Sequence, residues 1–272
     1  MHRRWIFFVV LVSLTAQAAL WNKPVQADQL MEISTRPGVT VRLALSVPET
    51  PKAVAVLFSG GHGHLLIDSQ GDIKRAGNFL IAARQNFAKF GMVAAAMDAP
   101  SDQLATHGKM SDRFRQSSEH VTDIRAVVAA LRQRFGVPVW LVGTSRGSTS
   151  VAHAAIEMNT AGAIRTDTAD GIVLTSSIGV HHQRDGNLLD MPLGAIRLPA
   201  LVLHHENDSC KVTPFTGARD IAAGLTASPR AGLIRITGGK RGNDVCGPVS
   251  HHGFRGQRGK VVKRIVKWIL TR

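Results

Sequence analysis

Short apolar runs alternate with longer segments of helical periodicity along most of the chain. Near the N-terminus, segments 30–35 and 39–47 flank the turn residues Arg36-Pro37-Gly38 and predict a pair of strands. Nearly continuous apolar runs follow at 53–58, 92–97, 137–142, 171–174, 200–203 and 233–236. Strands that are apolar on both faces are typical of a parallel sheet that helices cover. The pattern therefore predicts an α/β fold.

The segments between these runs carry apolar residues at helical spacing. Segment 121–135 has one apolar stripe and ends at Gly136, and segment 79–90 ends in the same way at Gly91. A glycine at this position can take the positive φ that closes the last turn of a helix. Both segments are therefore predicted helices.

The last segment, 260–270, is both amphipathic and basic. Val262, Ile265 and Ile269 share one face, and the lysines and arginines lie elsewhere. This pattern predicts a terminal helix that lies on the sheet with a solvated basic face. Weak association with an anionic membrane surface is the alternative.

Residues 28–272 contain no internal repeat and no interdomain linker, so we expect a single domain. Within it, segment 178–199 lacks a clear period and lies between two predicted strands. We interpret it as a candidate for a short lid, or as an ordinary crossover with one short helix.

The N-terminus has the order of a secretory signal. Arg3 and Arg4 precede an apolar run that is too short to span a bilayer, and small residues follow. We predict a signal peptide over 1–27, with cleavage after Ala27 or, alternatively, after Ala18; an uncleaved anchor is the other interpretation. Export would place the protein in the periplasm or outside the cell, where a pair of cysteines tends to form a disulfide.

Composition excludes several classes of protein. The 272 residues include 33 Lys plus Arg against 19 Asp plus Glu, and 44% are hydrophobic, as in a packed globular domain. The chain has no tyrosine, so no reaction that needs a phenolic group is available, and two cysteines cannot supply a four-thiolate metal site. Gly61-His62-Gly63 does not continue to the third glycine of a dinucleotide fingerprint, and no phosphate loop occurs. We expect no cofactor.

The strongest chemical motif is Gly143-Thr144-Ser145-Arg146-Gly147. It lies between the predicted strand 137–142 and the helical segment 148–158. In a Gly-x-Ser-x-Gly turn at such a corner, the serine projects above the sheet edge and the flanking positions must lack bulky side chains. Ser145 is therefore the candidate nucleophile.

With this motif, the chain from about Val54 onward resembles the α/β-hydrolase superfamily, and more narrowly its small secreted or dienelactone-hydrolase-like esterases. The resemblance implies a mostly parallel sheet of about eight strands with helices on both faces. It also implies a catalytic triad in the order serine, acid, histidine.

The resemblance assigns the acid and the base by position. Asp208 follows the predicted strand ending in Leu203-His204-His205 and is the expected acid, with Glu206 as the substitute. In Ser250-His251-His252-Gly253, the resemblance favours His252, directly before the glycine, over His251. A neutral imidazole can take the serine proton near pH 7 and return it to the leaving group.

An oxyanion hole needs backbone N–H groups directed at the developing negative charge. The amide of Arg146, directly after the nucleophile, is one expected donor. The glycine-rich segment Ser59-Gly60-Gly61-His62-Gly63 resembles the His-Gly-Gly-Gly loop of the superfamily and supplies the other, from Gly61 or from His62. Ser59 stands where that pattern often has histidine.

The two cysteines, Cys210 and Cys246, lie near the expected acid and the expected base. In an exported protein we interpret them as one disulfide that joins the acid loop to the histidine loop; two buried free thiols are the alternative.

Other chemistries have weaker support. Adjacent histidines such as His204 and His205 could bind zinc, but neighbours on a strand point to opposite faces, so we expect no metal site. The basic balance could mark a non-catalytic protein that binds anionic lipid or another polyanion, yet no specific nucleic-acid module occurs. We therefore expect an exported serine hydrolase acting on small carboxylic esters, with peptide or thioester cleavage as alternatives that use the same residues.

Overall fold

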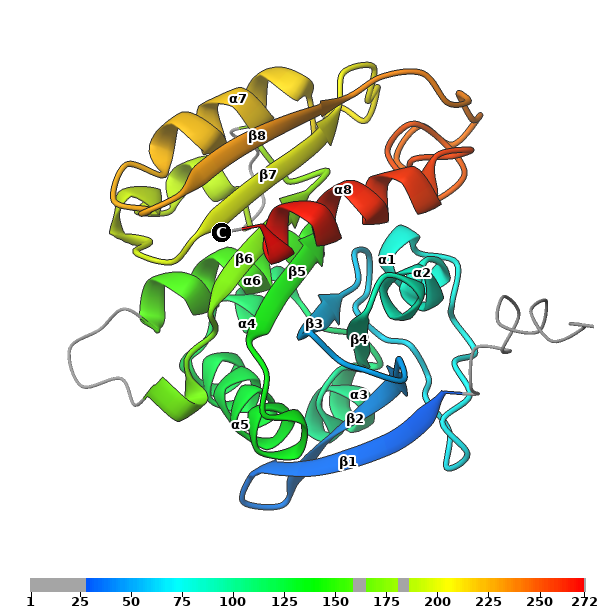
Figure 1. Cartoon of the computed structure of the whole chain (residues 1–272), viewed down its shortest axis with the longest axis vertical. Helices are drawn as coiled ribbons and strands as arrows, with labels where there is room; N and C mark the ends of the chain where they lie inside the picture. The colour runs from blue at the N-terminus through cyan, green and yellow to red at the C-terminus, as the bar shows by residue number, and fades with distance from the viewer. Residues whose placement is uncertain (1–27, 159–164, 181–185, 272) are drawn as a thin grey trace, which may run out of the picture.

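The structure is a computed structural model that describes residues 28–158, 165–180 and 186–271. The predicted signal peptide, 1–27, lies outside the described residues, and so does part of the segment 178–199. In these ranges an eight-stranded sheet is sandwiched between two layers of helices (Figure 1). The strands are β1 (Gln29–Arg36), β2 (Val39–Ser46), β3 (Ala53–Phe58), β4 (Met92–Met97), β5 (Val139–Thr144), β6 (Gly171–Thr175), β7 (Ala200–His205) and β8 (Ala231–Ile236).

The strand order is β1-β2-β4-β3-β5-β6-β7-β8. The hairpin strand β1 pairs antiparallel with β2, which pairs antiparallel with β4, and all pairs from β4 to β8 are parallel. The predicted mostly parallel sheet is therefore confirmed. Because these strands are parallel, the loops that follow them lie at one carboxyl edge of the sheet. The strand order reverses between β3 and β5, since β4 lies on one side of β3 and β5 on the other, and such sheets bind ligands at this point of the edge.

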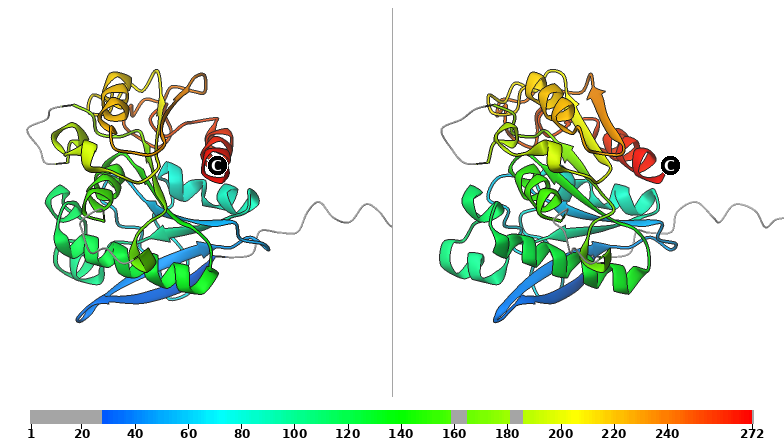
Figure 2. Two further views of the ribbon diagram at one scale, coloured as in Figure 1. Left: turned by 60° about the vertical axis from the view of Figure 1, so that its left-hand side comes forward. Right: turned by 90° about the vertical axis from the view of Figure 1, so that its left-hand side faces the viewer.

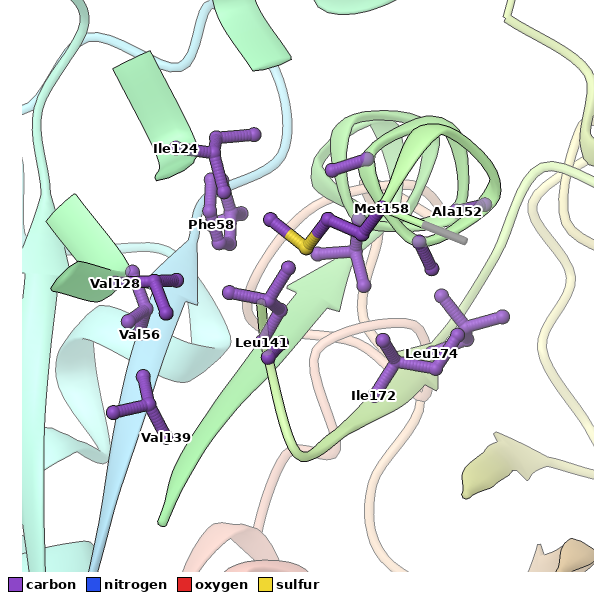
Figure 3. Close-up of a cluster of buried hydrophobic side chains, with 14 of the residues drawn as sticks. Val56, Phe58, Ile124, Val128, Val139, Leu141, Ala152, Met158, Ile172 and Leu174 are labelled. Atoms are coloured by element: carbon purple, nitrogen blue, oxygen red, sulfur yellow. The ribbon is translucent and has the colours of Figure 1, made fainter. Parts of the chain in front are cut away.

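Alternate residues of the central strands enter two separate cores. Val54, Val56 and Phe58 of β3 pack with the helices of one face, and Ala53, Ala55 and Leu57 pack with those of the other. Figure 3 shows part of the first core, in which Leu141 and Ile172 lie between the sheet and the helix that carries Ala152. The two helical layers are visible on opposite sides of the sheet in Figure 2.

One face is covered by α5 (Ser118–Phe135), α6 (Arg146–Glu157) and α7 (Phe215–Gly224), and the other by α1 (Phe79–Ala82), α2 (Arg84–Lys89) and α8 (Arg258–Leu270). Two shorter helices, α3 (Ser101–His107) and α4 (Asp112–Arg115), follow β4. The prediction of helices on both faces is confirmed. The terminal helix α8 buries Val262, Ile265 and Ile269 against the sheet and leaves Lys260 and Lys263 exposed.

Several boundaries differ from the sequence pattern. The predicted helix 79–90 is two helices, because the chain departs from helical geometry at Ala83. The helix predicted from Val121 begins at Ser118, because the Ser117 side chain accepts the His120 N–H and caps it. The described part of 178–199 holds two 3₁₀ turns, η2 (Leu188–Asp190) and η3 (Leu193–Ala195), with Leu188 and Leu193 in the core. A lid role for this segment stays a prediction.

Candidate active site

Ser145 occupies a sharp corner between β5 and α6. Its φ of 53° and ψ of −127° are a strained combination for a residue with a side chain. A methyl group on Gly143 would lie 2.5 Å from the Gly147 oxygen, and one on Gly147 would lie 2.1 Å from the Phe58 oxygen. Glycine is therefore required at both flanking positions, and the corner has the geometry of a nucleophile elbow.

Asp208 lies on the loop that follows β7, and its carboxylate is almost fully buried. Oδ1 accepts the N–H of Cys210 at 3.0 Å, and Oδ2 accepts the hydroxyl of Thr213 at 2.9 Å. Oδ2 is also 2.9 Å from Nδ1 of His252 and 3.3 Å from Nε2 of His204. Burial works against the ionised form, but the hydrogen bonds from His204 and His252 outweigh it and hold the pKa of Asp208 below its usual range. The carboxylate is therefore ionised at neutral pH.

His252 is held in place through its ring and its backbone. Nδ1 donates to Asp208, which leaves Nε2 of a neutral ring as an acceptor. The backbone N–H of His252 donates to Ser250 Oγ at 3.2 Å, and its carbonyl accepts the hydroxyl of Ser176 at 2.8 Å. The ring is thus oriented by groups from two other parts of the chain, as a general base requires.

The neighbouring His251 has a different environment. Its Nδ1 lies 3.0 Å from the Asn207 carbonyl oxygen, and its ring stacks on His205 with centroids 4.2 Å apart. Only His252 of the adjacent pair contacts the Asp208 carboxylate among the described residues.

Ser145 and His252 line one cavity of about 370 Å³ at the carboxyl edge of the sheet. The glycine-rich loop after β3 forms one wall, and the loop that contains Asp244 and Pro248 forms another. The structure thus joins Asp208 to His252 directly and brings Ser145 into the same cavity. In the described ranges no hydrogen bond links the Ser145 hydroxyl to His252.

The two predicted oxyanion donors come from the elbow itself and from the glycine-rich loop beside it. Arg146 is the first residue of α6, and Gly61 lies in a turn that the Gly63 N–H closes on the Gly60 oxygen at 3.2 Å. Neither the Gly61 nor the Arg146 amide donates to another described residue. The Arg146 side chain turns away to Asp112, with Nε 3.4 Å from Oδ1.

A buried arginine supports the glycine-rich loop and was not predicted. Arg115 is fully buried; it donates to the Gly61 carbonyl oxygen at 3.3 Å and to Ser150 Oγ on α6 at 3.1 Å. Burial lowers the pKa of its guanidinium to about 10, so it stays charged at neutral pH. Arg115 thereby ties the loop to the helix that begins at the nucleophile.

Asp98, at the end of β4, supports the same loop from the other side. Its carboxylate accepts the backbone N–H groups of Leu65 at 2.6 Å and of Ile67 at 2.9 Å. The residues that fix the loop therefore come from segments far from it in sequence, and no local signal marks them.

Cys210 and Cys246 form a disulfide, with Cα atoms 4.7 Å apart. The predicted pairing is confirmed. The bond joins the Asp208 loop to the His252 loop, and Cys246 itself lines the cavity.

The described residues contain neither a candidate metal site nor a candidate membrane-spanning helix. No group of three or more His, Cys, Asp or Glu side chains there is arranged to hold a metal ion. In the same ranges, no helix is long and apolar enough to cross a bilayer.

Solved structures with a similar chain path include esterases and a dienelactone hydrolase. A dienelactone hydrolase from Anabaena variabilis superposes with a TM-score of 0.59 at 15% identity, over 90% of this chain and 98% of that one. The propionate-bound esterase Est2 from Thermogutta terrifontis gives 0.60 at 17% identity, over 91% and 95%. Est1E from Butyrivibrio proteoclasticus gives 0.57 at 14% identity, over 89% and 98%.

The chain has the α/β-hydrolase fold. No family model matches the sequence, and a search of curated proteins finds no match either. At these identities the α/β-hydrolase fold is what the likeness establishes, so the chemistry has to be argued from the side chains of the site.

Proposed function

We propose that this protein is an exported serine hydrolase that cleaves carboxylic esters, with Ser145 as nucleophile, His252 as base and Asp208 as acid. The observation that carries the proposal is the 2.9 Å hydrogen bond between Asp208 and His252 beside a cavity that also contains the Ser145 elbow. A carboxylate, an imidazole and a strained serine converge here from three loops, in the chain order of the superfamily.

In the proposed reaction, His252 Nε2 takes the proton of the Ser145 hydroxyl as its oxygen attacks the ester carbonyl carbon. The C=O electron pair moves onto the acyl oxygen, and the N–H groups of Gly61 and Arg146 stabilise the resulting oxyanion. The imidazolium, stabilised by ionised Asp208, then returns the proton to the departing alcohol. Water attacks the acyl-enzyme by the same steps, releasing the carboxylic acid and Ser145.

The cavity supports a small substrate. Its volume of about 370 Å³ is at the lower end for small-molecule sites, and its walls carry Arg75, Asn78 and Asp244 beside Phe79 and Pro248. We expect short acyl chains to be preferred over long ones. The solved esterase with bound propionate is a neighbour in fold and is consistent with this expectation.

The test is hydrolysis of 4-nitrophenyl acetate and butyrate by the wild type and by Ser145→Ala. Loss of a triad serine costs on the order of a millionfold in turnover, so the variant should be indistinguishable from background. Ser118→Ala, at an exposed serine that does not line the cavity, is the matched control and should keep full activity. Equal turnover by the wild type and Ser145→Ala would contradict the proposal.

Peptide and thioester cleavage use the same groups, so the assay should compare substrates that share one acyl group. An ester, a thioester and an anilide of butyric acid differ only in the leaving group. The proposal predicts the highest kcat/KM for the ester. A higher value for the thioester or the anilide would reassign the substrate class while leaving the triad in place.

Export and location are part of the same proposal. The Cys210–Cys246 disulfide is typical of an oxidising compartment, in agreement with a signal peptide over 1–27. The exposed lysines of α8 would favour weak, salt-sensitive contact with an anionic membrane surface. Sedimentation with vesicles rich in phosphatidylglycerol, at low and at high salt, tests that contact against neutral vesicles.

A further inference from the structure

Asn78 lies directly before α1 and lines the same cavity as Ser145 and His252. Its side-chain oxygen, Oδ1, accepts the backbone N–H of Leu80 at 3.2 Å and caps the helix. Because the Leu80 N–H needs an acceptor, this bond holds Oδ1 on the side of the helix and so fixes the orientation of the carboxamide. The Nδ2 amide group therefore faces the other way.

Nδ2 of Asn78 faces the nucleophile elbow across Gly60. A methyl group on Gly60 would lie 3.4 Å from Asn78 Nδ2 and 2.9 Å from Cβ of Ser145. The Asn78 amide and the Ser145 side chain thus both lie beside the α-carbon of Gly60. Gly60 directly precedes the expected oxyanion donor Gly61. In the part of the chain that the structure describes, Nδ2 donates no hydrogen bond.

Helix capping alone does not account for this side chain. Serine, aspartate and asparagine all cap helices well, because each supplies an acceptor oxygen. Only asparagine of these three adds an N–H donor beyond that oxygen. At this position Asn78 lines the cavity, and the extra donor lies near the serine that would be acylated.

We propose that Asn78 is a catalytic residue whose Nδ2–H donates to the acyl oxygen of the ester as it becomes an oxyanion. It would be a side-chain donor beside the backbone amides of Gly61 and Arg146. The inference rests on the proposed hydrolase function. Since Oδ1 is already tied to the helix, the donor is oriented before substrate arrives and needs no rearrangement in the transition state.

The test separates the donor from the cap. Asn78→Ser and Asn78→Asp keep an oxygen for the Leu80 N–H but remove the Nδ2 amide donor, so both should fold with an unchanged melting temperature. A donor that acts mainly in the transition state affects kcat more than KM. We expect kcat to fall by about 100-fold or more, the range for loss of one such donor, with KM changed little.

Ser117→Ala is the matched control for capping, because Ser117 caps α5 and does not line the cavity. It should lower stability and leave kcat unchanged. A second readout is the rate at which a fluorophosphonate modifies Ser145, located by mass spectrometry. Its phosphoryl oxygen takes the place of the acyl oxygen, so the rate should fall in Asn78→Ser.

The outcomes distinguish the two proposals. If the wild type hydrolyses esters, Ser145→Ala does not, and Asn78→Ser has wild-type kcat and wild-type labelling, the Asn78 proposal is wrong and the proposed function stands. If the wild type neither hydrolyses esters nor is labelled at Ser145, the proposed function fails and the role of Asn78 falls with it.

Discussion

Oδ2 of Asp208 lies 2.9 Å from Nδ1 of His252, across a sequence separation of 44 residues. The bond selects the tautomer in which Nε2 is free to accept a proton. Asp208→Asn would instead present an amide to the ring and favour the wrong tautomer. We expect kcat to fall about 10⁴-fold with the fold retained, as measured by ester turnover together with circular dichroism. Near wild-type kcat in this variant would exclude Asp208 as the acid.

The lowered pKa of Asp208 also predicts a pH dependence of stability. Burial opposes the charge, but the hydrogen bonds from His204 and His252 favour it, so the native carboxyl ionises at lower pH than in the unfolded chain. Its contribution to the free energy of unfolding is therefore complete above about pH 4 and is lost as the pH falls through the lowered value. Urea unfolding at pH 7 and pH 2.5 should show that Asp208→Asn is less stable than wild type at pH 7, with a smaller difference at pH 2.5.

His120 predicts a second effect of pH, with a different origin. It is fully buried, and neither ring nitrogen has a hydrogen-bond partner among the described residues. Burial, with the positive charge of Arg115 nearby, lowers its pKa to about 3. Between about pH 6.5 and 3 the unfolded chain binds a proton that the native protein does not, so stability falls as the pH falls, by up to about 1.4 kcal/mol per pH unit.

His120→Phe should flatten that slope, because the phenyl ring cannot titrate and can pack between Phe58 and Phe114. His107→Gln, at an exposed histidine, should leave the slope unchanged. The free energy of unfolding is measured for each variant from pH 7 to pH 4. Parallel curves for wild type and His120→Phe would contradict the prediction.

The hydroxyl of Thr213 contacts both partners of the acid–base pair, at 2.9 Å from Asp208 Oδ2 and 3.1 Å from His252 Nδ1. Thr213→Val keeps the shape and removes the hydroxyl. We expect kcat/KM to fall by about tenfold, the effect of losing one hydrogen bond to a charged group. Thr149→Val is the matched control, because it removes an equally buried hydroxyl that donates to the Gly186 carbonyl oxygen. Its kcat/KM should stay within twofold of wild type, which corresponds to about 0.4 kcal/mol in activation free energy.

Removal of the disulfide should reduce stability and activity together. The Cys210–Cys246 bond closes a loop with a separation of 36 residues, for which chain entropy gives a stabilisation of about 4 kcal/mol. It also holds the Asp208 and His252 loops together. Cys210→Ala combined with Cys246→Ala should lower the melting temperature and kcat. Full activity of the reduced protein at low temperature would show that the bond stabilises the fold without positioning the site.

The sheet could be predicted from the sequence because its central strands are buried on both faces. The runs 53–58 and 92–97 coincide with β3 and β4. The prediction for β5 stopped at Val142, since Gly143 and Thr144 end the apolar run, whereas pairing with β6 continues to Thr144. At the sheet edge, β8 is exposed on alternate residues, so its first residues lacked the apolar signal.

The candidate triad and disulfide residues could be named from the sequence because local patterns mark them. Ser145 lies in a motif, and Asp208 and His252 follow strands in a known order. Thr213, Ser176 and Arg115 had no such mark. Their importance comes from contacts made only when distant segments fold together, such as the hydrogen bond from Ser176 to the His252 carbonyl. Asn78 was missed for the same reason, since its relation to Ser145 exists only across Gly60.

The close backbone approaches at Gly60, Gly143 and Gly147 have a consequence for how this fold can diversify. Any side chain at these positions would collide with main chain or with the serine itself. Mutation therefore has little freedom to change the backbone around Ser145, and new specificities would have to arise at other residues that line the cavity, such as Arg75 and Pro248. Directed evolution libraries confined to Arg75 and Pro248 should yield more active variants per clone than libraries that randomise the three glycines.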